Sequence, residues 1–145
     1  MKLSWISESW FDRLALRWHG TAVPRGEPLD VFFLLKSVQR ILIAPNDRVG
    51  GLFLGAPIYK LVRQAYPRAH ISLFVDETKA TIARQIPFVD EVVTASLDKA
   101  PWTAAFKQAI GELKKRDIDL LFCLGRDCSL RLAHLCGASG AKLRV

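Results

Sequence analysis

The stretch Arg40-Ile41-Leu42-Ile43-Ala44-Pro45-Asn46-Asp47-Arg48-Val49-Gly50-Gly51 decides the fold of this chain. Its apolar residues 41–44 are typical of a short strand that is buried on both faces of a sheet. A polar, glycine-containing loop follows, and apolar residues then recur at helical spacing as far as Tyr66. Pro57 lies within this helical pattern and, because it has no N–H group, is expected to kink or restart the helix. Strand, loop and helix in this order form the first unit of an α/β fold.

The same alternation continues to the end of the chain. Apolar runs predict strands over residues 70–75, 90–94 and 119–124, and residues 142–145 begin a fifth. Helices are expected between them: one through residues 80–86, one from Pro101 to Arg116, and one over residues 129–136 that Gly137 ends. Strands that alternate with helices across short connections predict an α/β fold with a Rossmann-like, doubly wound parallel sheet.

Residues 1–39 differ in character and are interpreted as an N-terminal amphipathic helical extension. Trp10, Leu14 and Trp18 recur at helical spacing, which predicts a helix over residues 6–18. An aromatic face of this kind either packs on a domain or lies on a membrane surface, and the sequence leaves both uses open.

The charge of the chain is uneven. The net charge is +7, with five Lys/Arg and four Asp/Glu over residues 1–39, against 16 and 10 over residues 40–145. A basic globular region suggests an anionic partner, although charge of this size can also serve solubility alone. Because no recognised nucleic-acid-binding motif accompanies it, we expect no nucleic acid partner.

The cysteines and the hydropathy of the chain bear on metal binding, disulfide bonds and location in the cell. Cys123, Cys128 and Cys136 have neither the paired spacing of a zinc site nor the even number of a disulfide framework. They are expected to be reduced, and neither a metal nor a cofactor is predicted. The sequence contains no run of about 18 apolar residues and no signal peptide pattern. We therefore expect a cytoplasmic protein, with peripheral contact at the inner membrane as an alternative.

The loop after the first strand is the first candidate site, because ligands of doubly wound sheets bind at the carboxyl ends of the strands. Gly50 and Gly51 would let the backbone approach a ligand, and the N–H groups at the start of the next helix attract anions. A tight turn alone would also explain both glycines. Neither the dinucleotide-binding fingerprint nor the phosphate-binding P-loop pattern occurs.

Two other strand ends carry polar residues. Arg126, after the fourth strand, could bind a phosphate or carboxylate of an acceptor, or could be a solvated loop residue. Ser129 could contact the same ligand or cap the following helix. Asp76 and Glu77, after the second strand, could perform acid–base chemistry, although capping of the next helix is the more common use of such residues.

These stretches resemble the opening of glycosyltransferase family 9, which includes the ADP-heptose:lipopolysaccharide heptosyltransferases. The resemblance rests on the order and spacing of residues 40–43, 47–50, 56–57 and 63–67, which match a strand, a D-R-I-G-D-like loop, an A-P pair and a helix ending in Y-P. Residues 86–92 are similar to the family's N-P-x-V-D-E-V, and residues 129–138 to its helix ending in L-A-G-A. The resemblance covers about residues 40–145.

The resemblance implies that residues 40–145 are the acceptor-side Rossmann-like domain, still incomplete, of a GT-B enzyme whose donor domain is absent from this chain. The implied reaction is the inverting transfer of a heptose or similar sugar from a nucleotide-sugar to a lipopolysaccharide core acceptor. The partners are then a lipid-linked sugar acceptor and, through the absent C-terminal domain, the nucleotide-sugar donor. Arg48, Gly50, Gly51, Arg126 and Ser129 become the expected acceptor-binding residues.

Gly51 departs from the family pattern, because the family's catalytic aspartate occupies that position. Glycine cannot accept the proton of the acceptor hydroxyl, and Asp47, four residues earlier, is the candidate to replace it. The alternative is that the chain is a degenerate, non-catalytic binding module of the same fold. Whether it is an enzyme is therefore left open by the sequence.

Overall fold

A computed structural model describes residues 35–45, 49–96, 103–124 and 130–145. The chain divides into two units, Met1–Asp30 and Val31–Val145, and all the described residues belong to the second. The helix predicted over residues 6–18 lies outside the described residues. Within the described part, no helix is both long and apolar enough to cross a bilayer.

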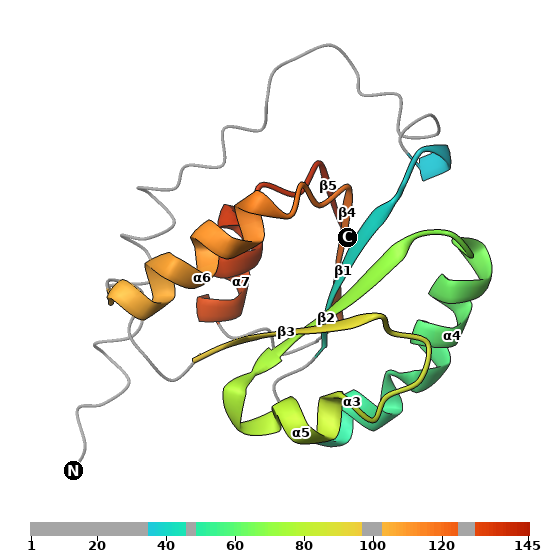
Figure 1. The fold of residues 1–145 in the computed structure, drawn as a ribbon, viewed down its shortest axis with the longest axis horizontal. Coiled ribbons are helices and arrows are strands. Elements are labelled where there is room, and N and C mark those ends of the chain that lie inside the picture. Colours follow the sequence, from blue (N-terminus) through green and yellow to red (C-terminus); the bar gives the residue numbers. More distant parts are fainter. Residues whose placement is uncertain (1–34, 46–48, 97–102, 125–129) are drawn as a thin grey trace. The chain divides into compact units, whose positions relative to one another are not determined.

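Five parallel strands form one sheet, as predicted (Figure 1). Their order across the sheet is β3-β2-β1-β4-β5. The strands are β1 (Arg40–Pro45), β2 (His70–Asp76), β3 (Glu91–Ala95), β4 (Leu120–Leu124) and β5 (Leu143–Arg144). Strand β1 is parallel to both of its neighbours, so the predicted α/β, Rossmann-like parallel arrangement is confirmed.

Helices follow the strands in the predicted order. They are α3 (Val49–Leu54), α4 (Ala56–Ala65), the 3-10 turn η1 (Glu77–Lys79), α5 (Ala80–Ala83), α6 (Ala104–Lys115) and α7 (Leu130–Ala138). The interruption predicted from Pro57 is confirmed, because Gly55 separates α3 from α4 and the proline lies in the first turn of α4.

Two helix boundaries differ from the prediction. Helix α6 begins after Thr103, whose hydroxyl accepts a hydrogen bond from the Phe106 N–H, so this threonine supplies the cap. Pro101, which was expected in the first turn, lies outside the described residues. Gly137 does not end α7, which runs on to Ala138; the left-handed backbone that follows is supplied by Gly140, with a φ of 80°.

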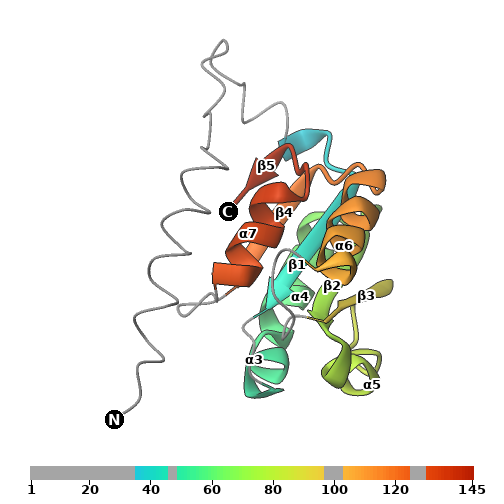
Figure 2. The same ribbon diagram turned by 90° about the vertical axis from the view of Figure 1, so that its left-hand side faces the viewer.

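The sheet is covered on both faces. Helices α3, α4 and α5 lie on one face and α6 and α7 on the other, which faces the viewer in Figure 2. Successive residues of β1 divide between the two cores: Ile41 and Ile43 pack with α3–α5, and Leu42 and Ala44 with α6–α7. Burial on both faces explains why residues 41–44 are continuously apolar.

Candidate functional site

The direction of the chain reverses between β1 and β4. From β1 the chain passes to β2 and β3 on one side, and then returns to β4 and β5 on the other. The register pairs Pro45 of β1 with Leu124 of β4, so the two loops that follow these strands begin side by side at the carboxyl edge. Ligands of open α/β sheets bind in the crevice at such a reversal.

The segments that follow β1 and β4 in the sequence are residues 46–48 and 125–129. They hold four of the six predicted site residues, and these lie outside the described residues: Asp47, Arg48, Arg126 and Ser129. The structure thus brings together the strand ends from which these residues follow. Sequence separation conceals this proximity, because Pro45 and Leu124 become neighbours only through the pairing of β1 with β4.

The other two predicted residues, Gly50 and Gly51, belong to the first turn of α3 and not to the loop. The interpretation of the pair as a tight turn is therefore wrong. Gly50 is exposed, and a Cβ placed on it would meet no atom within 4 Å. The space beside the Gly50 Cα is therefore open to an approaching molecule.

Asp76, at the end of β2, is the one carboxylate among the described strand ends at this edge. Its Oδ1 accepts hydrogen bonds from the Thr78 N–H at 3.0 Å and the Thr78 hydroxyl at 2.6 Å. The carboxylate therefore caps η1, and of the two uses open for Asp76 the structure shows the capping one. Glu77 is part of the same 3-10 turn.

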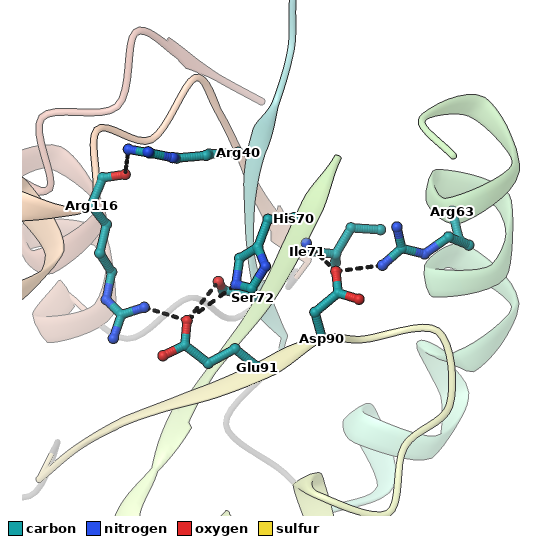
Figure 3. Close-up of polar contacts among 8 residues, drawn as sticks. All are labelled: Arg40, Arg63, His70, Ile71, Ser72, Asp90, Glu91 and Arg116. Atoms are coloured by element: carbon teal, nitrogen blue, oxygen red, sulfur yellow. Dashed lines mark hydrogen bonds and ion pairs between the residues drawn. The ribbon is translucent and has the colours of Figure 1, made fainter. Parts of the chain in front are cut away.

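Among the described residues, Asp90 and Glu91 lie at the amino edge of the sheet, where β3 begins (Figure 3). Asp90 and Glu91 at the start of β3 point to opposite faces. An Asp90 carboxylate oxygen lies 2.5 Å from the Arg63 guanidinium of α4 and accepts the Ile71 N–H at 2.7 Å. Glu91 pairs with Arg116 at the end of α6. These two ion pairs connect β3 to a helix on each face of the sheet.

The contacts of this pair of acids shift their acidity. Partial burial alone would raise the pKa of Asp90, but the Ile71 N–H and the Arg63 guanidinium outweigh it and lower that pKa. The Arg116 hydrogen bond, opposed by burial and assisted by His70, lowers the pKa of Glu91. Both groups are therefore stabilised as anions, which suits structural ion pairs and not proton transfer at neutral pH.

Asp119 performs a similar role at the start of β4. It accepts hydrogen bonds from the backbone N–H groups of Gln39 and Arg40, at 2.9 and 3.0 Å, and from the Lys142 amine at 2.8 Å. Burial would raise its pKa, but Lys142 and these N–H groups lower it. A polar cavity of about 270 Å³ adjoins this cluster at the amino edge. Because it lies at the end of the sheet away from the β1–β4 reversal, it is not the predicted site.

Sequence reasoning did not assign these amino-edge contacts. The resemblance covered Asp90 and Glu91 only as part of a family motif. Part of their signal was available, because two adjacent residues at the start of a strand face opposite helical layers. The identity of those partners, Arg63 and Arg116, depends on how α4 and α6 pack.

Comparisons with known proteins agree with the family resemblance. No family model matches the chain. A Haemophilus influenzae protein described as "Putative glycosyltransferase" is 26% identical over 82 residues, which cover 57% of this chain and 23% of that protein. Two solved structures share the fold, each with a TM-score of 0.60 over 73% of this chain and 30% of the other. They are the ADP-heptose lipopolysaccharide heptosyltransferase II of Escherichia coli, at 18% identity, and a family 9 glycosyltransferase of Veillonella parvula, at 20%.

The chain is thus similar in sequence to a glycosyltransferase-like protein and shares its fold with part of two family 9 structures. It spans less than a third of the length of each of these three proteins. The fold is the α/β arrangement that the resemblance implied.

Proposed function

We propose that this chain is the acceptor-side domain of a family 9 glycosyltransferase, the N-terminal half of a GT-B enzyme. The proposed reaction is the inverting transfer of a heptose or similar sugar from a nucleotide-sugar to a lipid-linked lipopolysaccharide core acceptor. The observation that carries the proposal is the adjacency of the carboxyl ends of β1 and β4, which precede residues 46–48 and 125–129, in a fold shared with two family 9 structures. The enzyme would work on the cytoplasmic side of the inner membrane, where it would meet its acceptor.

The two loops supply the chemistry that such an acceptor needs. Arg48 and Arg126 are cations whose planar guanidinium groups match the phosphates or carboxylates of a lipopolysaccharide core. The open backbone at Gly50 leaves room for the acceptor next to the first turn of α3. Ser129 can donate to a sugar hydroxyl from the second loop.

In the proposed reaction the acceptor hydroxyl attacks the anomeric carbon of the donor sugar. A bond forms between the acceptor oxygen and that carbon, while the bond from the carbon to the nucleotide phosphate breaks and the nucleotide leaves. The hydroxyl proton passes to a carboxylate, for which Asp47 is the candidate because Gly51 has no side chain. The domain would hold and orient the acceptor, and the donor would bind in a second domain.

Acceptor binding by the 145-residue chain is the direct test. Calorimetric titration with a deacylated, water-soluble lipopolysaccharide core oligosaccharide should show binding. Arg48→Ala and Arg126→Ala should each weaken it about tenfold, the usual effect of losing a charge-assisted hydrogen bond. Lys107→Ala, on the exposed side of α6, is the matched control and should leave affinity unchanged. Equal affinity of the parent and both arginine variants would reject the site.

Sugar transfer separates the enzyme from the second candidate function, a binding module that has lost catalysis. Gly51 is the observation that favours this second function. We expect the isolated chain to transfer no sugar from ADP-heptose, and measurable transfer would overturn that expectation. In a protein joined to a donor domain, Gly51→Asp should raise the rate, by up to about 10²–10⁴ if it restores a general base. If Gly51→Asp has no effect while Asp47→Asn abolishes transfer, Asp47 is the base; if neither change matters and no transfer occurs, the chain is a binding module.

A further inference from the structure

The exposed apolar side chains of the described residues are concentrated on two successive helices. Seven large apolar residues are exposed in this part of the chain, and five of them belong to α3 and α4. Leu54 is 82% exposed and Leu61 is 62% exposed, which leaves most of each side chain in water. We call this set the α3–α4 apolar face: Val49, Phe53, Leu54, Ile58 and Leu61.

The α3–α4 apolar face is distinct from the surface that packs on the sheet. In α4, Tyr59 and Val62 are buried against the core, whereas Ile58 and Leu61 occupy the neighbouring flank, three residues apart. In α3, Val49 and Phe53 are four residues apart and so share a side of the helix. The two helices follow one another on the same side of the sheet (Figure 1). Concentrated apolar exposure of this kind marks an interaction surface.

The segment of chain that carries the α3–α4 apolar face contains basic residues and no acidic ones. Residues 49–75 contain two arginines and a lysine but no aspartate or glutamate. Arg63 is engaged by Asp90, whereas Lys60 and Arg68 are exposed. Apolar side chains flanked by lysine and arginine are the pattern that binds an anionic membrane surface. A symmetric dimer would instead set the exposed Lys60 and Arg68 of one copy against the same cations of the other, which disfavours a second copy as the occupant.

We propose that the α3–α4 apolar face, with Lys60 and Arg68, docks on an anionic lipid bilayer. Leu54 and Leu61 enter the boundary between headgroups and acyl chains, and the two cations contact lipid phosphates. The role that we give to this docking, which is to bring the domain to its acceptor, rests on the proposed function. Helix α3 begins directly after loop 46–48, so a docked domain would hold the acceptor site beside the surface at which a lipid-linked acceptor presents its sugar.

Cosedimentation of the full 145-residue chain with vesicles tests this proposal independently of any acceptor. Vesicles of equimolar phosphatidylcholine and phosphatidylglycerol, without lipopolysaccharide, should bind the parent chain. Leu54→Ser combined with Leu61→Ser should lower the partition coefficient about tenfold or more, because two apolar side chains no longer enter the bilayer. Val145→Ser, which changes an exposed apolar residue outside the face, is the matched control and should bind as the parent does.

The electrostatic part has its own pair of variants. Lys60→Gln with Arg68→Gln should weaken binding to the anionic vesicles about thirtyfold, because two cations near the membrane surface are removed, and salt should also weaken the binding of the parent. Lys107→Gln with Lys114→Gln removes two exposed cations from α6 on the opposite face of the sheet and should have little effect. Circular dichroism and thermal unfolding of every variant establish that each is folded before binding is compared.

Several outcomes would overturn the proposal. The parent chain could fail to bind anionic vesicles, or the leucine double variant could bind as tightly as the parent. If that variant converted a dimer to a monomer in size-exclusion chromatography without changing vesicle binding, the face would be a self-association surface. None of these results depends on sugar binding. The soluble oligosaccharide can therefore bind in the titration even if the chain does not dock on vesicles, and the chain can dock on vesicles even if the oligosaccharide does not bind.

Discussion

Replacing Gly55 with alanine tests the packing at the junction of α3 and α4. A Cβ on Gly55 would lie 2.4 Å from the Tyr59 hydroxyl oxygen and 2.6 Å from the ring carbon that bears it. Tyr59 has no exposed surface, so its ring cannot move outward into water. The added methyl group therefore has to displace a buried aromatic side chain or shift the two helices apart.

Two opposing effects determine the sign of the change. Gly55 has φ −74° and ψ −15°, a helical conformation that alanine adopts without strain. At such a position Gly→Ala alone stabilises a protein by about 0.4–1 kcal/mol, because the unfolded chain loses freedom. Overpacking of a well-filled core costs about 1–3 kcal/mol. Since contacts at 2.4 and 2.6 Å are far inside van der Waals distance, we expect the clash to prevail, with a net loss of about 1–2 kcal/mol.

Urea unfolding followed by circular dichroism measures this difference. With a slope of about 1–3 kcal/mol per molar urea, the midpoint for Gly55→Ala should fall by roughly 0.5–1 M. Gly111→Ala, within α6, is the control, because a Cβ there would meet no atom within 4 Å. That variant should gain about 0.5–1 kcal/mol from helix propensity.

Tyr59→Phe completes a double-mutant cycle. Burial raises the pKa of Tyr59 to about 12, and its hydroxyl has no hydrogen-bond partner among the described residues. Removing this oxygen should thus cost little by itself. In the Gly55→Ala background it should restore part of the lost stability, because the shortest contact disappears while the contact to the ring carbon remains. A Gly55→Ala variant that is more stable than the parent, or a cycle without coupling, would refute the reasoning.

Three further predictions concern the amino edge of the sheet. The pKa values of Asp90 and Glu91 are lowered in the folded protein, so the stability that these two carboxylates contribute should be complete above about pH 4, the usual pKa of unfolded carboxyls. This contribution should be lost as the pH falls through the lower pKa values of the folded protein. Asp90→Asn should therefore flatten the loss of stability in acid-unfolding curves, and an unchanged acid profile would contradict the assignment. Asp119→Asn should lower the free energy of unfolding by about 1–2 kcal/mol, because the carboxylate accepts two backbone N–H bonds and the Lys142 amine; a thermal midpoint equal to that of the parent would show that these bonds contribute little. Asp117 is exposed and has a φ of 48°, and glycine adopts this left-handed backbone without strain. Asp117→Gly should therefore raise the free energy of unfolding by up to about 1 kcal/mol. A lower urea midpoint would mean that the ion pair of Asp117 with Lys142 outweighs the strain.

The sequence alone determined the class of the fold and placed its described strands and helices to within about three residues. The apolar run of residues 41–44 has no polar alternation, which is typical of a strand covered on both faces. Pro57 predicted the break between α3 and α4 because proline cannot donate within a helix. Thr103 could not be preferred over Pro101 as the start of α6, because both are common at the beginning of a helix and the difference lies in one hydrogen bond.

What the sequence could not supply was adjacency between distant segments. The order β3-β2-β1-β4-β5 sets Pro45 at the end of β1 beside Leu124 at the end of β4, although about 80 residues separate them in the chain. Helix packing on the sheet likewise decides which cations pair with Asp90 and Glu91. It also decides that the buried Tyr59 side chain packs against Gly55. Local periodicity determines whether a segment is a strand or a helix, because it reflects which faces are buried. Which side chains meet is decided by the tertiary structure, because strand pairing and helix packing bring together groups that no local pattern relates.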